Sequence, residues 1–446
     1  MTKTDERDAA AGLVEFLRAC PTAFHAVDQI RRRLDAAGFA YLPERAAWDV
    51  RAGGSYYTVR NNSSVVAWKV GAEVDPTVAP HHFQMCAAHG DSPSYKVKAV
   101  PELAGPGKYL RLDVEGYGGM LDHTWLDRPL GVAGRALVRV GARVESRLVD
   151  VREDVCLIPS LAIHFDRERG LAPRLNRAVD LCPLFSAGAL ERGAFARVVA
   201  EAAGCAADDL LGYDLFLVAH EEPRVWGVAG EFVSGGHIDD LQCAYAALRA
   251  FLATDNARDV SVFACFDNEE VGSLTKQGAS STLLADALAR VSAGLGATDE
   301  AHSRALAASM LLSCDNAHAV HPNHAAECDE ANRCALNGGL VVKESASQLY
   351  CTDAFSRAAL VAVLERAGVP YQVFGNRSDK RGGSTLGNLS NAQVSVHAVD
   401  VGCPQLAMHS VFETAGARDT ALAIDALSAF YGTDLVIDGA DSVELR

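Results

Sequence analysis

Two adjacent glutamates, Glu269 and Glu270, come shortly after an apolar run over 260–266. The run is typical of a buried strand, and in open α/β sheets ligands bind beyond the carboxyl ends of the strands. Neighbouring residues on an irregular loop can point in different directions, so one carboxylate can bind a cation while the other faces a substrate. An isolated pair of this kind is more often a solvated acidic turn, but other polar clusters along the chain favour the chemical interpretation.

Histidine or aspartate also stands at the end of a predicted strand, at a helix start or in a loop at four other places: His89, Asp239, Asp315 and His409. Together with a glutamate they offer five nitrogen and oxygen ligands. Such a set suits two zinc-like cations, with one carboxylate shared between them. Paired cations activate water and polarise a carbonyl in hydrolysis, and a remaining free carboxylate can carry the proton of that water.

The motifs of other common enzyme classes are missing. The chain has no His-Glu-x-x-His helix, no Gly-x-Ser-x-Gly elbow, no Walker loop and no Gly-x-Gly-x-x-Gly fingerprint. Cysteine offers no alternative site, because the twelve cysteines are scattered and form no Cys-x-x-Cys pair. We expect them to be reduced and mostly buried.

The elements that must position these residues alternate between strands and helices. Helical periodicity predicts a first helix over 9–19, and 55–70 reads as a hairpin. Short β-like pieces with many turns fill the region from 95 to 232. We therefore expect an α/β catalytic domain, with a mixed sheet flanked by helices, formed by residues 1–94 and 233–446. We expect residues 95–232 to be an inserted, mainly β domain.

Composition sets the remaining limits. The net charge of −16 argues against nucleic acid and an anionic membrane as partners. No apolar run is long enough to span a bilayer. The polar, acidic residues 1–8 do not resemble a signal peptide, so we expect a cytoplasmic protein.

The chain resembles the aspartyl aminopeptidase family of dinuclear zinc metallopeptidases over almost its full length. The words that carry the resemblance, in order, are HGDSP at 89–93, TWLDRPLGVAGR at 124–135, PSLAIH at 159–164, HIDD at 237–240, DNEEVGS at 267–273, SCDNAHAVHPN at 313–323, GGSTLG at 382–387 and QLAMHS at 405–410. Each word is weak alone, but their order and spacing are specific. The resemblance implies a zinc-exopeptidase-like catalytic domain.

The resemblance also implies a role for each candidate. Two divalent cations are expected, zinc first, although this ligand set also accepts cobalt or manganese. His89 and Asp315 would bind one cation, Glu270 and His409 the other, and Asp239 would bridge them. Glu269 would be the general base and acid. Asp91 would hold His89 in the required tautomer and orientation.

Other implied features concern assembly and substrate. The inserted domain would drive dimerisation, and dimers would assemble into a dodecamer. The spacing around His164 alone favours a structural histidine, whereas the resemblance implies that it reaches a neighbouring subunit's site and contacts substrate. Peptides with a free N-terminal Asp or Glu would be the substrates. Lys343 is the candidate for binding their acidic side chain.

Some alternatives stay open. Asp240 could replace Asp239 as a ligand, and His318 or His321 could replace Asp315, although Asp315 directly follows the strand. A deacylase or carboxypeptidase could use the same dinuclear site. A non-catalytic, metal-dependent assembly protein is a further alternative, but a structural metal site would not require Glu269.

Overall fold

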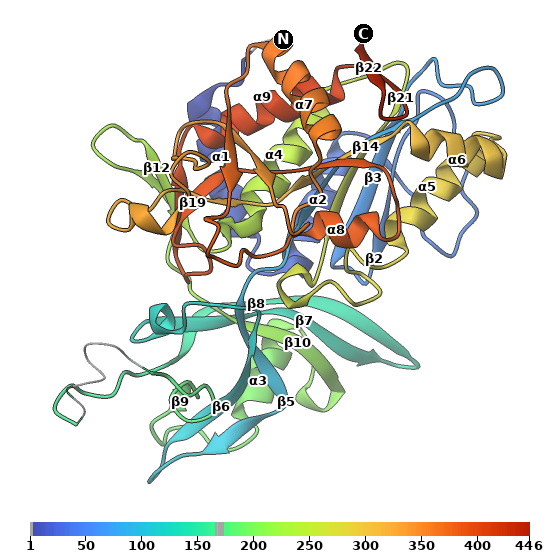
Figure 1. Cartoon of the computed structure of the whole chain (residues 1–446). Helices are drawn as coiled ribbons and strands as arrows, with labels where there is room; N and C mark the ends of the chain where they lie inside the picture. Colours follow the sequence, from blue (N-terminus) through green and yellow to red (C-terminus); the bar gives the residue numbers. More distant parts are fainter. Residues whose placement is uncertain (1–2, 166, 168–173) are drawn as a thin grey trace.

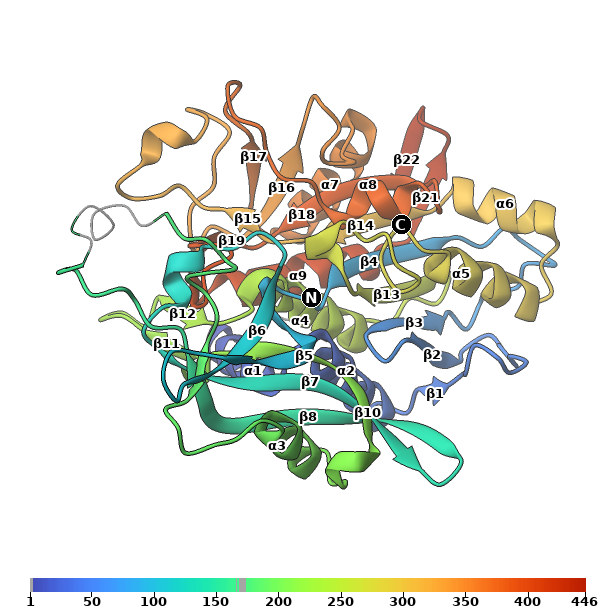
Figure 2. The same cartoon turned by 90° about the horizontal axis from the view of Figure 1, so that it is seen from below.

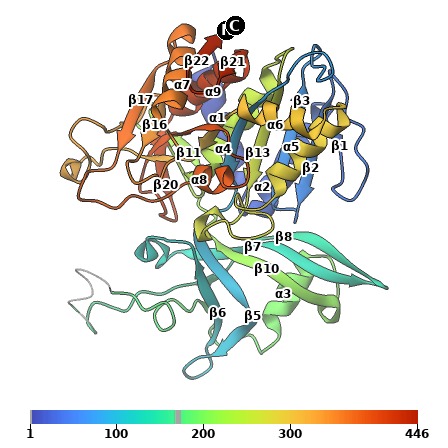
Figure 3. The ribbon, with the colours of Figure 1, turned by 45° about the vertical axis from the view of Figure 1, so that its right-hand side comes forward.

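The computed structural model describes residues 3–165, 167 and 174–446 and shows two parts (Figure 1). An α/β body contains both ends of the described chain. A β-barrel lies against the side of the body that faces away from these two ends. Figure 3 shows the same separation from another direction. The predicted α/β class with a mainly β second part is thereby confirmed.

Within the described residues, nine strands form one mixed sheet in the body. Their order across the sheet is β1 (Ala40–Tyr41), β2 (Ser55–Arg60), β3 (Ser64–Val70), β13 (Val260–Phe266), β4 (Phe83–His89), β14 (Met310–Cys314), β18 (His397–Gly402), β16 (Leu340–Glu344) and β17 (Tyr371–Gly375). Strands β13, β4, β14 and β18 run parallel to one another. Their carboxyl ends therefore share one edge, where the polar residues that follow them meet.

Helices cover both faces of this sheet, which explains the continuous apolar runs of its central strands. Along β13, Phe263 and Cys265 pack on one face, while Val262 and Ala264 pack on the other. The first face is covered by α1 (Glu6–Ala19), α2 (Ala23–Ala36), α4 (Ile238–Ala253), α7 (Ala354–Ala367) and α9 (Asp419–Tyr431). The second is covered by α5 (Leu283–Gly294), α6 (Asp299–Ala307) and α8 (Leu386–Asn391).

A smaller sheet in the body borders the functional edge. Its strands, in order, are β11 (Arg224–Trp226), β12 (Phe232–Gly235), β20 (Glu413–Gly416), β19 (Pro404–Leu406) and β15 (Ala317–His318). Near the end of the chain, β21 (Leu435–Asp438) and β22 (Ser442–Leu445) form a hairpin. The hairpin predicted over 55–70 is confirmed by β2 and β3.

The barrel closes through six strands of the described chain. Their order is β10 (Leu210–Val218), β5 (Ser94–Ala104), β6 (Leu110–Tyr117), β9 (Leu184–Ser186), β8 (Arg143–Leu157) and β7 (Pro129–Val140), with α3 (Ala194–Ala202) packed against it. Seen from below, β7 lies beside α2 of the body (Figure 2). The barrel strands thus occupy 94–218, and β11 already pairs within the body. The division at 95–232 stays a prediction.

Strand β18 begins only at His397. The N–H groups of Gln393 and Val394 donate to the carbonyl of Ser390, so these residues complete the turn after α8. None of the helices in the described chain is both long and apolar enough to cross a membrane.

Candidate active site

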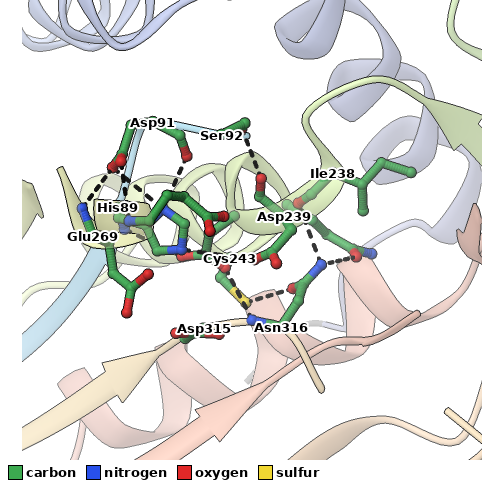
Figure 4. A network of polar contacts seen from close by, with 12 residues as sticks. His89, Asp91, Ser92, Ile238, Asp239, Cys243, Glu269, Asp315 and Asn316 are labelled. Carbon is green, nitrogen blue, oxygen red and sulfur yellow. Dashed lines mark hydrogen bonds and ion pairs between the residues drawn. The ribbon is translucent and has the colours of Figure 1, made fainter. Parts of the chain in front are cut away.

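The five predicted metal ligands and Glu269 come from different elements and meet at the edge where β4, β13 and β14 end. His89 is the last residue of β4, Asp315 directly follows β14, and Asp239 lies in the first turn of α4. The two glutamates occupy a single 3₁₀ turn after β13, and His409 lies in the loop between β19 and β20. Figure 4 shows several of these side chains turned toward one another.

Left-handed backbone conformations set the course of the chain in two of these segments, the glutamate turn and the loop of His409. Asn268, with φ 64°, stands directly before the glutamate turn, and His409 itself has φ 66°. Positive φ is uncommon for residues other than glycine. At these positions it turns the chain sharply, so that Glu269 and Glu270 face different neighbours. The reasoning about an irregular loop after the strand is therefore consistent with the structure.

The ligand atoms form two overlapping clusters among the described residues, one of His89, Asp239 and Glu270 and one of His89, Glu269 and Asp315. In each cluster the atoms lie within 4.8 Å of one another. Asp239 lies between two histidines. Its Oδ1 is 3.6 Å from Nε2 of His89, and its Oδ2 is 3.2 Å from Nε2 of His409. A carboxylate that faces two nitrogen ligands in this way suits a bridging position.

The carboxylate oxygens of this site are suited to binding metal cations. Oδ1 of Asp239 and Oε1 of Glu270 are buried and accept no hydrogen bond from the described part of the chain. Buried acceptors without a partner are costly. Burial, with the carboxylates of Asp315 and Asp91, raises the pKa of Glu269 to about 8. Burial and the carboxylate of Asp239 raise the pKa of Glu270 as well. Divalent cations would satisfy these crowded acceptors.

Asp91 supports the site through three neighbours. Its Oδ1 accepts a hydrogen bond from the backbone N–H of Glu269 (3.1 Å), and its Oδ2 accepts one from Glu270 (3.2 Å). Its Oδ1 lies 3.5 Å from Nδ1 of His89, but the shorter contact of that nitrogen, 3.0 Å, is with the backbone carbonyl of Asp91. Asp91 thus orients His89 through main chain and side chain together (Figure 4).

Two further buried carboxylates hold the backbone of the ligand segments, and sequence reasoning did not assign either of them this role. Asp240 accepts hydrogen bonds from the N–H groups of His89 and Asn316, both at 3.2 Å. Glu413 accepts from the N–H groups of Asp239 (3.0 Å) and His409 (2.7 Å). Asp240 is therefore engaged with main chain, which favours Asp239 as the ligand.

The signals for these supporting residues were weak in the sequence. Glu413 lies four residues after His409 in a short mixed segment, where an acid usually means a solvated turn. Tyr117, on β6 of the barrel, donates a hydrogen bond to Oδ2 of Asp91 (2.7 Å) and accepts one from Nδ2 of Asn268 (2.8 Å). A tyrosine at the end of a predicted β piece carries no chemical signature, so only the three-dimensional structure reveals it.

Lys343 is fully buried beside Asp315. Its Nζ donates to the carbonyl oxygens of Asp315 (2.7 Å) and Asn316 (3.3 Å), and it lies 3.4 Å from Oδ1 of Asp315. Although burial acts to lower it, the carboxylate of Asp315 raises the pKa of Lys343. The ammonium also lies 5.3 Å from the ring centre of Tyr350. These contacts position Asp315 at the same time as they place a positive charge in the wall of the site.

The ligand candidates line a cavity of about 320 Å³. Lys343, His318, Tyr350, Phe374 and Met408 are also part of its wall. His321 lines a neighbouring cavity of about 290 Å³, which shares His318, Phe374 and Met408 with the first. His318 and His321 are thus near the site, but neither belongs to the two ligand clusters found among the described residues.

His164 lies elsewhere. It is exposed on the loop after β8, and it is not among the described residues that line the cavity. Leu161, Ile163 and Phe165 on the same loop are also exposed. The structure of one chain thus leaves the predicted contact with a neighbouring site as a prediction.

Comparison with known proteins agrees with this geometry. Residues 16–431 match the family model of the aminopeptidase I zinc metalloproteases (M18). A probable M18 family aminopeptidase 2 of Clostridium novyi is 40% identical over 425 residues, covering 94% of this chain and 97% of that protein. Another with the same name, from Pseudomonas aeruginosa, is 39% identical and covers 95% and 97%.

Solved structures give the same result. A cryo-EM structure of the Ape4 and Nbr1 complex has a TM-score of 0.91 and 30% identity, covering 97% of this chain and 88% of that chain. The mApe1 dodecamer of S. cerevesiae has a TM-score of 0.82 and 26% identity, covering 95% and 96%. The chain therefore belongs to the M18 family of zinc metallo-aminopeptidases, enzymes that hydrolyse peptide bonds.

Proposed function

We propose that the chain is a dinuclear metallo-aminopeptidase in which the carboxylate of Asp239 would be shared by two zinc ions. His89 and Asp315 would hold one of them, and Glu270 and His409 would hold the other. The observation that carries this proposal is the placement of Asp239. Its two carboxylate oxygens face the two histidines, and its Oδ1 has no hydrogen-bond partner among the described residues. A shared carboxylate between two nitrogen ligands is what a two-metal hydrolase requires.

The chemistry of the site divides between cations and protein. Paired cations lower the pKa of a bound water and polarise the peptide carbonyl. Glu269, at the cavity wall, takes the proton of the attacking water and passes it to the leaving amine. Asp91 keeps Glu269 in place through the backbone N–H of that residue, and it keeps His89 oriented. The crowded carboxylates also suit the free α-amine of a peptide.

We further propose that the enzyme prefers peptides with an N-terminal Asp or Glu. Lys343, buried in the cavity wall, is the positive charge available to an acidic side chain. It is already bonded to Asp315 and Asn316, so the substrate would share its protons with them. Zinc is the expected metal, and cobalt or manganese would fit the same ligand types.

Assembly and location are part of the proposal. One solved structure similar to this chain is the dodecamer of mApe1, which supports a homo-oligomer. We propose that this homo-oligomer is a dodecamer built from dimers. In such an assembly the exposed loop with His164 would reach a neighbour's site and contact substrate there. The inserted barrel would provide the dimer contact. All twelve cysteines are unpaired, which suits a cytoplasmic protein.

Turnover of chromogenic substrates that begin with Asp, Glu, Leu or Lys tests the function. The purified protein is assayed before and after its metal is stripped and restored. We expect metal-dependent cleavage confined to Asp and Glu. An N-acetylated Asp substrate serves as the control, because an aminopeptidase loses activity on a blocked amine and a deacylase does not. Cleavage of the blocked substrate would contradict the proposal, and metal-dependent cleavage of Leu alone would contradict the acidic preference.

A further inference from the structure

A second cavity, of about 370 Å³, lies where the barrel meets the α/β body. It shares no lining residue with the cavity of the metal ligands. Its barrel side is formed by β5, β6, β7 and β10, and its body side by the start of α2, the turn between β2 and β3, and the loop over 267–277. Its volume falls in the range of small-molecule sites.

Two cations converge on one neutral oxygen in this cavity. Nζ of Lys276 lies 2.6 Å and Nη2 of Arg135 lies 3.3 Å from Oδ1 of Asn61, and Nη1 of Arg135 donates to the Asn61 backbone carbonyl at 2.9 Å. Asn61 and Asn62 both have positive φ, as the tight hairpin turn between β2 and β3 requires. The turn thereby presents the oxygens of Asn61 to the cations.

Three carboxylates, those of Asp91, Asp214 and Asp267, also line the cavity. Asp214 pairs with both Lys96 (2.8 Å) and Arg135 (3.0 Å). Lys276 forms no ion pair with any carboxylate of the described chain, and its bonds go to amide oxygens. Burial, the charge of Arg135 and the charge of Arg60 lower the pKa of Lys276, and the carboxylates of Asp267 and Asp214 oppose this shift. An added anion would relieve this repulsion between like charges.

The other two acids that line the cavity, Asp91 and Asp267, accept hydrogen bonds from neighbouring groups. Asp91 accepts hydrogen bonds from Tyr117 and from two backbone N–H groups, and Asp267 accepts from the N–H of Asn268. The start of α2 also faces the cavity. Its N-cap, Thr22, makes no side-chain cap, and no acid lies in its first turn. The free N–H groups there add to the positive potential.

Aromatic rings give the cavity an apolar wall between its charged ends. The guanidinium of Arg135 lies 4.5 Å from the ring centre of Phe24, and Phe216 packs edge-on against Tyr117. A ligand with one charged group and a small organic body would contact both kinds of surface.

We propose that this cavity binds a small molecule bearing an oxyanion, a phosphate or a carboxylate, whose charged group lies between Lys276, Arg135 and the start of α2. The opposite wall contains Tyr117 and Asn268, which are bonded to each other and, through Tyr117, to Asp91. Because Asp91 also accepts from the N–H of Glu269, the cavity wall at Tyr117 is two hydrogen bonds away from the active site.

Calorimetric titration of the metal-loaded enzyme tests this proposal, with inorganic phosphate in one arm and succinate in the other, at constant ionic strength. Lys276 is exposed, so Lys276→Gln removes its charge without disturbing the core. Lys98→Gln is the matched control, because Lys98 is also exposed but lies on β5 of the barrel and pairs with Asp113 outside the cavity. We expect affinity for one probe to fall at least ten-fold in Lys276→Gln and to stay unchanged in Lys98→Gln.

The probe that binds identifies the charged group of the ligand. The metal ions bind phosphate as well, but Lys276→Gln should weaken only the binding in this cavity, so the change in affinity between wild type and variant separates the two sites. Equal affinity in the wild type and Lys276→Gln, or no binding of either probe, would overturn the proposal. A loss of equal size in both variants would show a non-specific charge effect and would overturn it too. Binding is measured without turnover, so the outcome does not depend on the proposed peptidase specificity.

Discussion

The hydroxyl of Tyr117 donates a 2.7 Å hydrogen bond to Oδ2 of Asp91, although the two residues belong to different parts of the molecule. Tyr117 ends strand β6 of the barrel, and Asp91 follows strand β4 of the body. Asp91 in turn contacts His89 and the backbone of both glutamates. The barrel therefore takes part in positioning the active site, in addition to any role in assembly.

Removing that hydroxyl should weaken metal binding. We expect Tyr117→Phe to lower zinc affinity about ten-fold, the usual size for a residue that orients a ligand. Tyr95→Phe is the matched control, because Tyr95 also donates to an aspartate, Asp122, at 2.6 Å, and neither residue lines the cavity of the ligand candidates. Competition with a chromogenic chelator measures the affinity. A similar loss in both variants would mean that the effect is only one of barrel stability.

Substitution of the two neighbouring glutamates should affect different properties, kcat for Glu269 and metal binding for Glu270. We expect Glu269→Gln to keep its metal and to lose about 10²- to 10⁴-fold in kcat, as for a missing general base. Glu270→Gln should lose metal, because its Oε1 is a buried acceptor without a hydrogen-bond partner. Metal content by elemental analysis and kcat are measured on both. If Glu269→Gln also loses metal, Glu269 is a ligand, as its cluster with His89 and Asp315 would permit.

Lys343 has two roles that a substitution can separate. We expect Lys343→Met to lower kcat/KM for Asp substrates about 100-fold more than for Leu substrates, because a charged partner of the side chain is lost. Lys380→Met, in the adjacent cavity and paired with Glu327, should leave that ratio unchanged. An equal fall for all substrates would mean that Lys343 acts only by holding Asp315.

Stability should depend on pH through a buried acid far from the site. Burial raises the pKa of Asp259 to about 8 from 3.8, so the folded state favours its protonated form. The stability that it contributes is present at low pH and is lost as the pH rises toward 8. Between pH 6 and 8 this amounts to about 1.4 kcal/mol for each pH unit at most.

Asp259→Asn stays neutral and should therefore lose less stability than the wild type over that range. Asp255→Asn, at a highly exposed aspartate nearby, is the control and should follow the wild type. Unfolding by urea at pH 6, 7 and 8 measures the difference. Parallel curves for the wild type and Asp259→Asn would contradict the expectation.

Much of the site could be predicted from the sequence, because strand ends are marked by the change from apolar to polar residues. That signal located His89, Glu269, Glu270 and Asp315, since parallel strands bring their carboxyl ends to one edge. His409 is different, because it lies in a loop whose course depends on the smaller sheet. The residues alone made His409 a candidate ligand, and the resemblance to a family assigned it to one of the two cations.

The supporting residues could not be predicted, for a physical reason. Asp240 and Glu413 act by accepting backbone N–H groups from segments far away in the chain, and no local pattern encodes those partners. Their types alone are typical of a helix start and a turn. The second cavity, which Tyr117 lines, likewise depends on how the barrel packs against the body. The alternation of strands and helices in the sequence does not specify that packing.

The frame of Asp91, Asp240 and Glu413 holds mostly main-chain N–H groups of the ligand segments, and of the three only Asp91 also contacts a ligand side chain, that of His89. A substitution at a ligand position therefore leaves the framework standing, and only the identity of the donor atom changes. Metal preference can thus diverge among relatives by single exchanges of ligand type, without rebuilding the edge of the sheet. A substitution of one of these three acids would displace two segments at once. We therefore expect them to vary little among relatives, although they are not metal ligands themselves.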